Sequence, residues 1–392
     1  MIILLLLSGC SVKNKQENKE VEVSETELLN EKVLKKVESL SLREKIGQMF
    51  IISYNTTKFD NKLYDILVKN KPGGFIVMNY NISTYEETKI LIENIHNTVS
   101  IPMFIAIDEE GGKVQRLKSL TDVSVTDIPD MFTIGSINDD NLSYKIGKII
   151  GEEVKSLGIN MVYGPVLDTG NYETSSLKKR IISFDPLIVK QVGLNIGKGI
   201  LDTGVIPVYK HFPGIANTTV DSHLNLPVIE KTKEELLKME LIPFMEAIQN
   251  KAEVMMVGHV NYPNLTNDNI PSSLNKKIIT DLLRDELGYE GIVVTDAINM
   301  KALTNNYTEQ EIYELGIKAG VDMFIMPNDL AKAIDIVESL VKDGSIEEEL
   351  INKAVIRILK VKEKYLANFQ SLNKSYLGSN SHLKVLEDYN LK

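Results

Sequence analysis

The sequence has little of several residue types, and each shortage excludes a class of protein. Its 392 residues contain one cysteine, so no intrachain disulfide can form, and they contain no tryptophan. Lysine and arginine number 44 against 54 acidic residues, and they form no basic stripe. Because phosphate backbones are bound by clustered lysine and arginine, the formal net charge of -10 argues against a nucleic-acid partner. Histidine is also scarce, with five in the chain.

Long hydrophobic runs are missing as well, except at the start of the chain. The segment MIILLLLSGC, residues 1–10, is apolar and ends in small residues before the single cysteine, Cys10. This pattern is typical of a secretory signal, and it is shorter than the roughly 20 apolar residues that span a bilayer. Its Leu-Ser-Gly-Cys end resembles the bacterial lipobox, which implies a lipid on Cys10. The usual basic residues before the apolar run are missing, and a chance apolar terminus with a buried cysteine is the alternative.

Composition divides the chain into four parts. We predict a signal peptide with a lipobox at 1–10 and a flexible polar tether at 11–27. One folded domain at 28–370 and a C-terminal tail at 371–392 follow. The expected location is the bacterial cell envelope, outside the cytoplasm, with a monomer that contacts the membrane only through its N-terminal lipid.

Within the folded part, eight short apolar runs alternate with longer amphipathic stretches. This alternation predicts βα units and a parallel sheet. Eight such units favour a single (β/α)8 TIM barrel with an extra C-terminal helix over an open doubly wound sheet, because no G-x-G-x-x-G turn follows an early strand. The expected strands are residues 49–53, 74–78, 103–107, 159–163, 205–209, 254–258, 292–295 and 322–326.

Three of the amphipathic stretches carry a recognisable helix start. Ser83 or Thr84 is placed to cap a helix over 83–99. Two others have the spacing of a capping box, in which a Ser or Thr is followed three residues later by Glu. These pairs are Thr232 with Glu235, and Ser345 with Glu348.

A barrel places its chemistry just after the strands, where their C-terminal ends share one face. Polar side chains follow six of the eight expected strands at that point, a regularity that scattered polar residues would not produce. They are Asp108, Asp168, Lys210, His211, His259, Asp296 and Asn328.

Asp296 directly follows the apolar run GIVVT. A carboxylate at the mouth of a barrel can attack an electrophilic carbon or stabilise a cation. Aspartate is also a good N-cap, and the helix-like stretch AINMKAL comes next. Position alone leaves the two interpretations equal.

The stretch KHFPGIANTTVDSH, residues 210–223, places two of the five histidines in one irregular segment. Asp221 and His223 are two residues apart, so in an extended loop their side chains point the same way. The carboxylate can then fix the tautomer of the imidazole and leave its other nitrogen free for proton transfer. The alternative is a surface loop with an incidental Asp-Ser-His.

The stretch DEEGGKVQRL places Asp108 and Arg116 eight residues apart around a Gly-Gly turn. Such a pair can bind hydroxyl groups, with arginine offering a rigid fork of donors, or it can be an ordinary surface ion pair. Arg180 alone reads as a solvated side chain. His96 and His382 are expected to be structural or exposed.

Two mechanisms fit these residues. In the first, Asp296 is the nucleophile and His223 the acid/base group of a retaining glycoside hydrolase. In the second, His211, His259 and an aspartate hold a metal ion that activates water. Barrel hydrolases of the second kind resemble one another in a His-x-His after the first strand, and this chain has no such pair. We therefore predict no metal.

Several motifs in order resemble glycoside hydrolase family 3, in particular its bacterial β-N-acetylglucosaminidase branch. The resemblance covers about residues 38 to 365. Its motifs are LSLREKIGQMF, IDEEGGKVQRL, the segment around Arg180, KHFPGIANTTVDSHLNLP, VMMVGHVNYP and GIVVTDAINMKAL.

The resemblance implies a role for each site residue. Asp296, with Met300 in step, falls on the nucleophile, and Asp221 and His223 fall on the acid/base dyad. His259 is expected to line the same pocket. No cofactor is implied, and the partner is a carbohydrate. The residues that fall on sugar-binding positions are Asp108, Arg116, Arg180, Lys210 and His211.

The chain departs from the family at two places. Ile215 and Ala216 stand where the family has His-Gly, which is expected to alter loop closure and lower turnover without removing the chemistry. Lys113 replaces a usual Arg, a mild change. The expected function is hydrolysis of terminal non-reducing β-N-acetylglucosamine with retention, acting on peptidoglycan fragments. A phosphorylase of the same fold and a non-catalytic lipoprotein that binds wall sugars stay as alternatives.

Overall fold

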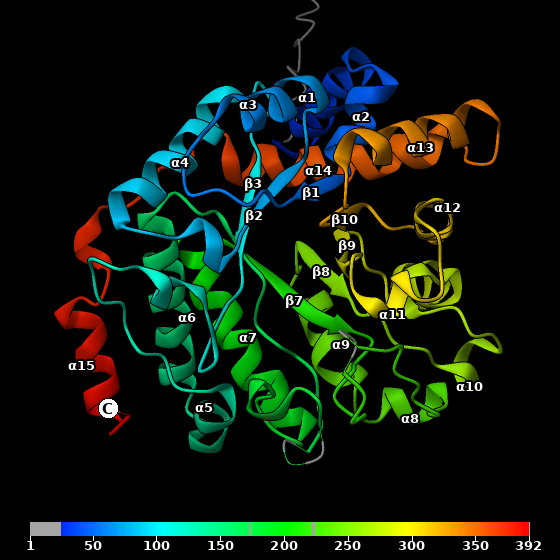
Figure 1. Ribbon diagram of the computed structural model, residues 1–392. Helices are drawn as coiled ribbons and strands as arrows, with labels where there is room; N and C mark the ends of the chain where they lie inside the picture. Colours follow the sequence, from blue (N-terminus) through cyan, green and yellow to red (C-terminus); the bar gives the residue numbers. More distant parts are fainter. Residues whose placement is uncertain (1–24, 172, 174, 222–223, 392) are drawn as a thin grey trace, which may run out of the picture.

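The structure is a computed structural model that describes residues 25–171, 173, 175–221 and 224–391. The expected signal segment with Cys10, most of the tether, and His223 lie outside the described residues. Eight parallel strands close into a barrel in the order β1-β10-β9-β8-β7-β6-β3-β2, with helices around it (Figure 1). The predicted TIM barrel is therefore confirmed.

All eight expected strands are present, and two of them run further than expected. β7 continues through Lys210 and His211 because Phe212 still pairs with Val257 of β8 after a register shift. β9 continues through Asp296, since Ala297 pairs with Ile325 of β10. The barrel strands are β1 (Phe50–Ile52), β2 (Gly74–Val77), β3 (Phe104–Ile107), β6 (Met161–Val162), β7 (Ile206–Phe212), β8 (Val254–Val257), β9 (Ile292–Ala297) and β10 (Met323–Ile325).

Helices follow the strands and cover the outside of the barrel (Figure 1). A segment over Lys277–Glu286 has the wider π-helical hydrogen-bonding pattern. The α-helices are α1 (Glu25–Ser39), α2 (Leu42–Gln48), α3 (Asn61–Asn70), α4 (Tyr85–Thr98), α5 (Met131–Ile137), α6 (Asp140–Ser156), α7 (Pro186–Asp202), α8 (Lys233–Leu237), α9 (Leu241–Gln249), α10 (Pro263–Thr266), α11 (Lys301–Thr304), α12 (Glu309–Ala319), α13 (Leu330–Lys342), α14 (Glu348–Leu366) and α15 (Asn380–Asp388).

Two of the three predicted helix starts are confirmed. Thr84 caps α4, and Thr232 caps α8 in a capping box with Glu235. The stretch after Thr232 is two helices rather than one, and Pro243 lies in the first turn of α9, where a proline needs no amide hydrogen. The third prediction is wrong. Helix α14 begins later than a Ser345 cap requires, with Glu347 as its N-cap and no side-chain cap bond.

The two ends of the described chain hold more structure than composition predicted. Helix α1 begins at Glu25, inside the expected tether. The expected tail contains α15, which lies against α6 (Figure 1). Its His382 is buried and bridges Glu152 and Glu153 of α6 at 2.9 and 3.1 Å. A charged histidine between two carboxylates explains why this short helix docks there, and its pKa is raised to about 9: burial lowers it, but the two carboxylates outweigh the burial.

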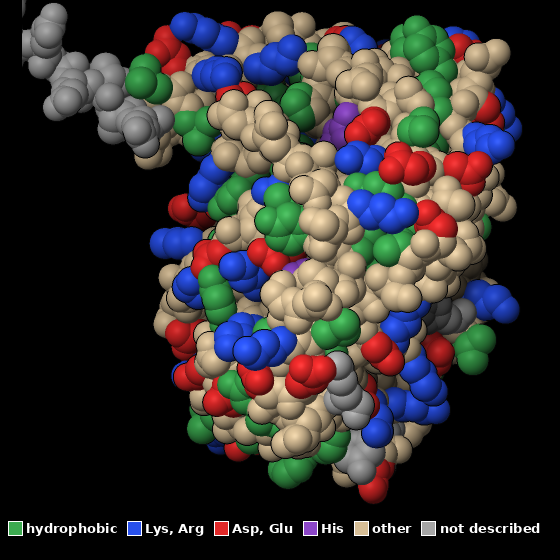
Figure 2. Space-filling model, turned by 90° about the vertical axis from the view of Figure 1, so that its left-hand side faces the viewer, with side chains coloured by type: hydrophobic (Ala, Val, Ile, Leu, Met, Phe, Trp, Pro, Cys, Tyr) green, Lys and Arg blue, Asp and Glu red, His purple; other side chains and the backbone are tan. Residues whose placement is uncertain are grey.

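The outer surface is polar, whereas the barrel beneath it is apolar. Figure 2 shows side chains of both charges interspersed over one face, with hydrophobic side chains scattered between them. Within the described ranges, no helix is long and apolar enough to cross a membrane.

An aromatic cluster joins the first and last strands where the barrel closes. The ring of Phe324 on β10 lies 5.8 Å from Phe50 on β1 and 5.5 Å from Tyr313 on α12, and all three side chains are buried. Aromatic pairs at these separations add to the energy of their buried area.

We expect Phe324→Ala to lower the free energy of unfolding by about 3–5 kcal/mol, because it leaves a cavity between fixed neighbours. Urea denaturation followed by circular dichroism measures the change. Tyr64→Ala is the control, since the Tyr64 side chain is 48% exposed. Equal effects of the two substitutions would contradict this account of barrel closure.

Candidate active site

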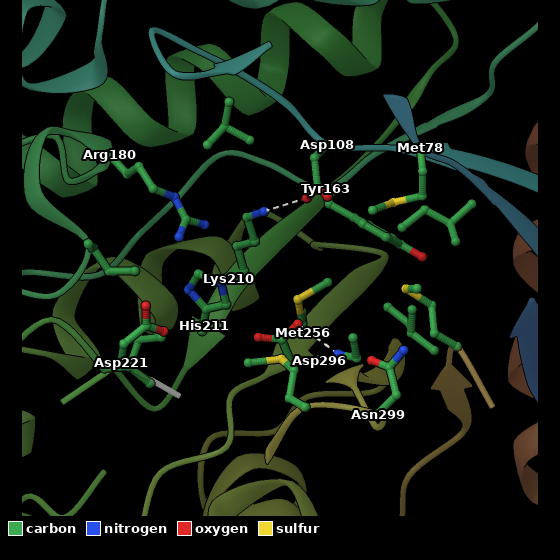
Figure 3. A pocket seen from close by; sticks show the side chains of 18 of the residues that line it. Met78, Asp108, Tyr163, Arg180, Lys210, His211, Asp221, Met256, Asp296 and Asn299 are labelled. Atoms are coloured by element: carbon green, nitrogen blue, oxygen red, sulfur yellow. Dashed lines mark hydrogen bonds and ion pairs between the residues drawn. The ribbon is translucent and has the colours of Figure 1, made fainter. Parts of the chain in front are cut away.

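A cavity of about 380 Å³ opens where the barrel strands end. Its volume lies in the range of small-molecule sites, about 300–1,000 Å³. Figure 3 shows the side chains that point into it from the ends of several strands. The structure brings together seven of the residues expected from the sequence, namely Asp108, Arg116, Arg180, Lys210, His211, Asp221 and Asp296.

Asp296 is the second-last residue of strand β9 and is partly exposed to this cavity. Its Oδ1 accepts a hydrogen bond from the Ala297 amide at 2.7 Å. It does not cap the following helix, because α11 begins at Lys301 with Met300 as its N-cap. The structure therefore removes the capping alternative that position alone left open.

The surroundings of Asp296 keep its carboxyl group ionised. Burial alone would raise its pKa. The imidazoles of His211 and His259, the Ala297 amide and the Lys210 ammonium act in the opposite direction, and the net result is a lowered pKa. A carboxylate that is both ionised and open to a cavity is suited to attack an electrophilic carbon.

Lys210 is the centre of a buried charge network beside Asp296. Its side chain is 2% exposed, and its Nζ lies 3.1 Å from Asp108 Oδ1 and 2.5 Å from Glu110 Oε1. Arg180 donates two hydrogen bonds of 2.9 Å to the same Glu110 carboxylate, and Arg116 lies 3.5 Å from Asp108 Oδ2. Burial would raise the pKa of Glu110, but Arg180 and Lys210 hold it well below its usual value.

The Gly-Gly turn places these carboxylates. Strands β4 (Glu109–Gly111) and β5 (Val114–Gln115) form a hairpin after β3, and Gly111 and Gly112 adopt φ angles of 99° and 56°. A Cβ on Gly111 would lie 2.7 Å from the Pro129 carbonyl oxygen, so the position requires glycine. Because side chains alternate along a strand, Glu110 reaches the charge network while Glu109 points away from it.

Sequence reasoning missed Glu110 and gave Asp168 no role. Asp168 is fully buried, and its Oδ2 accepts from the His211 amide at 3.0 Å and from His211 Nδ1 at 2.7 Å. Its Oδ1 accepts from the Ile215 amide at 2.6 Å. The carboxylate thus requires a proton on Nδ1 and fixes the plane of the ring. The available signals were three consecutive acidic residues at 108–110 and the place of Asp168 after the fourth strand.

His259 does not line the cavity as expected. It is 1% exposed, its Nδ1 lies 2.7 Å from Ser273 Oγ, and its Nε2 lies 3.1 Å from the Ala297 carbonyl oxygen. The imidazole therefore supports the strand end behind Asp296. It does not converge with His211 on a metal, and no three His, Cys, Asp or Glu side chains among the described residues are grouped as metal ligands.

Asp221 lines the cavity from the segment that follows β7. Figure 3 shows it and Asp296 on either side of His211. The amides of Leu224 and Asn225 donate to its backbone carbonyl at 2.9 and 3.1 Å. His223, the other predicted member of the dyad, lies in the gap between the described ranges.

The departure from the family pattern is buried. Ile215 and Ala216 are 5% and 2% exposed, and Ile215 lines the cavity. An added Cβ on Gly258 would lie 2.9 Å from Ile215 Cγ2, which shows how closely the two segments approach. The apolar side chain of Ile215 thus forms part of the cavity wall at a position where the family pattern has an imidazole.

Residues 41–361 match the family described as Glycosyl hydrolase family 3 N terminal domain. Beta-hexosaminidase A of Pseudoalteromonas piscicida is 29% identical over 357 residues, which cover 84% of this chain and 60% of that protein. A beta-hexosaminidase of Nitrosomonas eutropha is 30% identical over 274 residues, which cover 68% of this chain and 77% of that protein.

Solved structures give the same result. A glycoside hydrolase family 3 beta-N-acetylglucosaminidase from Paenibacillus sp. str. FPU-7 aligns with a TM-score of 0.84 at 30% identity. The alignment covers 89% of this chain and 68% of that chain. The chain thus spans about 60% to 77% of the length of these relatives.

Glu109 lies on the side of the hairpin away from the charge network, and its ionisation state can be tested. Its side chain is buried, and its Oε2 accepts from the Leu117 amide at 3.1 Å. Burial raises its pKa to about 8; the Leu117 amide lowers the pKa, and the nearby Glu153 carboxylate raises it further. The folded protein therefore keeps a proton that the unfolded chain releases above pH 4.5.

Stability should fall as the pH rises from 4.5 to about 8, since the unfolded state binds fewer protons in that window. We expect Glu109→Gln, which stays neutral and keeps an acceptor, to remove this loss. The variant should be more stable than the wild type by about 4 kcal/mol at pH 8 and by less than about 1 kcal/mol at pH 5. Urea denaturation at both pH values measures it. If the difference in stability between wild type and variant were the same at both pH values, Glu109 would ionise equally in the folded and unfolded states.

Proposed function

The chain belongs to glycosyl hydrolase family 3, and we propose that it is a retaining exo-β-N-acetylglucosaminidase that hydrolyses terminal, non-reducing β-linked N-acetylglucosamine. The observation that carries this proposal is the ionised Asp296 at the end of β9, open to a cavity whose wall is a network of buried charges. The names of the relatives support the sugar and favour hydrolysis over phosphorolysis.

In the first step, a carboxylate oxygen of Asp296 attacks the anomeric carbon, the bond to the leaving oxygen breaks, and a covalent glycosyl-enzyme forms. The network around Lys210 supplies both donors and acceptors for sugar hydroxyls. Lys210 and Arg180 donate, and Asp108 accepts. Because these groups already hold one another in place, little rearrangement is needed when a sugar binds.

His223 is the proposed acid/base group, and Asp221 is its orienting partner. The imidazolium gives its proton to the leaving oxygen, and the neutral ring then takes a proton from the water that attacks the glycosyl-enzyme. The place of Asp221 on the cavity wall, on the same segment and two residues away, supports this assignment.

The natural substrate and the location of the protein are also proposed. The lipobox-like segment ending at Cys10 favours a lipid anchor outside the cytoplasm, next to the wall. Terminal N-acetylglucosamine on peptidoglycan fragments would then be the substrate within reach. A wall-sugar-binding lipoprotein without activity is less well supported, because Asp221, His223 and Asp296 are all retained.

We expect the protein to release nitrophenol from p-nitrophenyl β-N-acetylglucosaminide in the presence of EDTA and without phosphate. Asp296→Ala should lower kcat by about 10³-fold or more, since it removes the atom that forms the covalent bond. Asp343→Asn, at the exposed end of α13, is the matched control and should keep full activity.

Three results would contradict the proposal. Dependence on added phosphate would indicate transfer to phosphate, and loss of activity on chelation would indicate a metal hydrolase. A folded wild type without activity would favour a binding protein. Proton NMR of the first sugar released tests retention directly, because a retaining enzyme yields the β-anomer first.

A further inference from the structure

One buried carboxylate holds both ends of the segment that carries Asp221. Glu240, between α8 and α9, is 1% exposed, and its Oε1 accepts a hydrogen bond from Asn217 Nδ2. The same Oε1 pairs with the Lys231 ammonium. Asn217 begins the segment, close after the end of β7, and Lys231 ends it just before α8. Glu240 thus fixes the distance between the two ends.

The neighbouring contacts anchor the same two ends. On the first side, the Tyr262 hydroxyl donates to the Gly214 carbonyl at 2.5 Å, and Asn217 Nδ2 lies 3.2 Å from the Thr169 carbonyl oxygen. On the far side, Ile229 and Asn261 join two backbone segments through a 2.9 Å bond.

Between these anchors, the described hydrophobic side chains next to Asp221 are exposed to solvent. Val220 and Leu224, which flank Asp221 closely, are 39% and 58% exposed. Functional residues on such a surface segment are positioned by the scaffold that holds its ends.

We propose that Glu240 is a positioning residue that sets how the 217–231 segment presents its acid/base group to the cavity. The inference deepens the proposed glycosidase and rests on it. Glu240 is not among the residues that line the cavity, and its effect passes through the positions of Asn217 and Lys231.

The chemistry of the contact favours this role over simple stabilisation. A buried ion pair is often no better for stability than apolar side chains of similar size, because both charges lose their water. Glu240 Oε2 is moreover buried without a hydrogen-bond partner among the described residues. The contact therefore contributes little to the free energy of unfolding. Its presence is explained by the fixed positions that it gives to both ends of the segment.

The test compares two substrates that differ in their need for an acid. Diacetylchitobiose has a poor leaving group that must be protonated, whereas p-nitrophenolate leaves without a proton. The value of kcat/KM reports the steps up to formation of the glycosyl-enzyme, so a misplaced acid lowers it only for the first substrate.

We expect Glu240→Gln to lower kcat/KM about tenfold on diacetylchitobiose and less than about twofold on p-nitrophenyl β-N-acetylglucosaminide, since general acid catalysis as a whole supplies about 10²–10⁴-fold. Lys231→Met should show the same split. Its side chain is 27% exposed, so its loss threatens folding less. Lys233→Met, which removes an exposed pair with Glu286 on the same stretch, is the matched control and should change neither value.

Two outcomes would overturn the inference while leaving the proposed function intact. One is an equal loss on both substrates by folded variants, which is the result of general disturbance of the site. The other is wild-type behaviour of Glu240→Gln and Lys231→Met on both substrates. A wild type that cleaves neither substrate would overturn the proposed function, and this inference with it.

Discussion

The site depends on one interaction, the pairing of the Lys210 ammonium with Asp108 and Glu110 inside the barrel mouth. An ammonium group that is 2% exposed has lost its water, and without partners it would give up its proton. Burial lowers its pKa, but the two carboxylates outweigh that effect and the pKa is raised. The fixed charge joins strand β7 to the end of β3 and to the hairpin that follows it.

The same charges set the ionisation states of the neighbouring carboxyl groups. Glu110 is saturated by Lys210 and by both donors of Arg180, so it stays ionised and cannot serve as an acid. Asp296 lies within the field of the Lys210 ammonium and of the His211 and His259 imidazoles, and it stays ionised as well. Glu110 behind the cavity and Asp296 on its wall therefore differ in function, because one is enclosed by donors and the other is open.

The sequence predicted those features that depend on local pattern. Eight apolar runs gave the eight barrel strands, because a buried parallel strand leaves an apolar run in sequence. The caps at Thr84 and Thr232 were confirmed for a similar reason, since a cap needs neighbours only three residues away. The order of motifs located Asp296 and most of the cavity wall.

What the sequence did not predict depends on long-range contacts. Glu110 is a site residue through Arg180 and Lys210, which lie 70 and 100 positions away in the chain. Asp168 acts through His211, and His259 was misplaced because its partner Ser273 comes from another loop. Ser345 has the spacing of a cap, yet its amide donates to Asp343 Oδ1 and the helix begins later. Spacing alone cannot tell which acceptor a side chain or amide meets.

A second buried lysine shows why the chemistry lies at one end of the barrel. Lys362 on α14 reaches the opposite end, where its Nζ donates to the Gln48 side-chain oxygen at 2.7 Å and lies 5.1 Å from the Phe104 ring centre. Both of these neighbours are neutral, and burial lowers the pKa of Lys362 well below the usual value. Lys210 and Lys362 are equally buried, at 2% exposure each. Carboxylates contact Lys210, whereas Lys362 contacts an amide oxygen and an aromatic ring, so the charged form of the buried lysine is favoured at the mouth of the barrel. A charge held in such a low-dielectric site can strongly polarise a polar ligand.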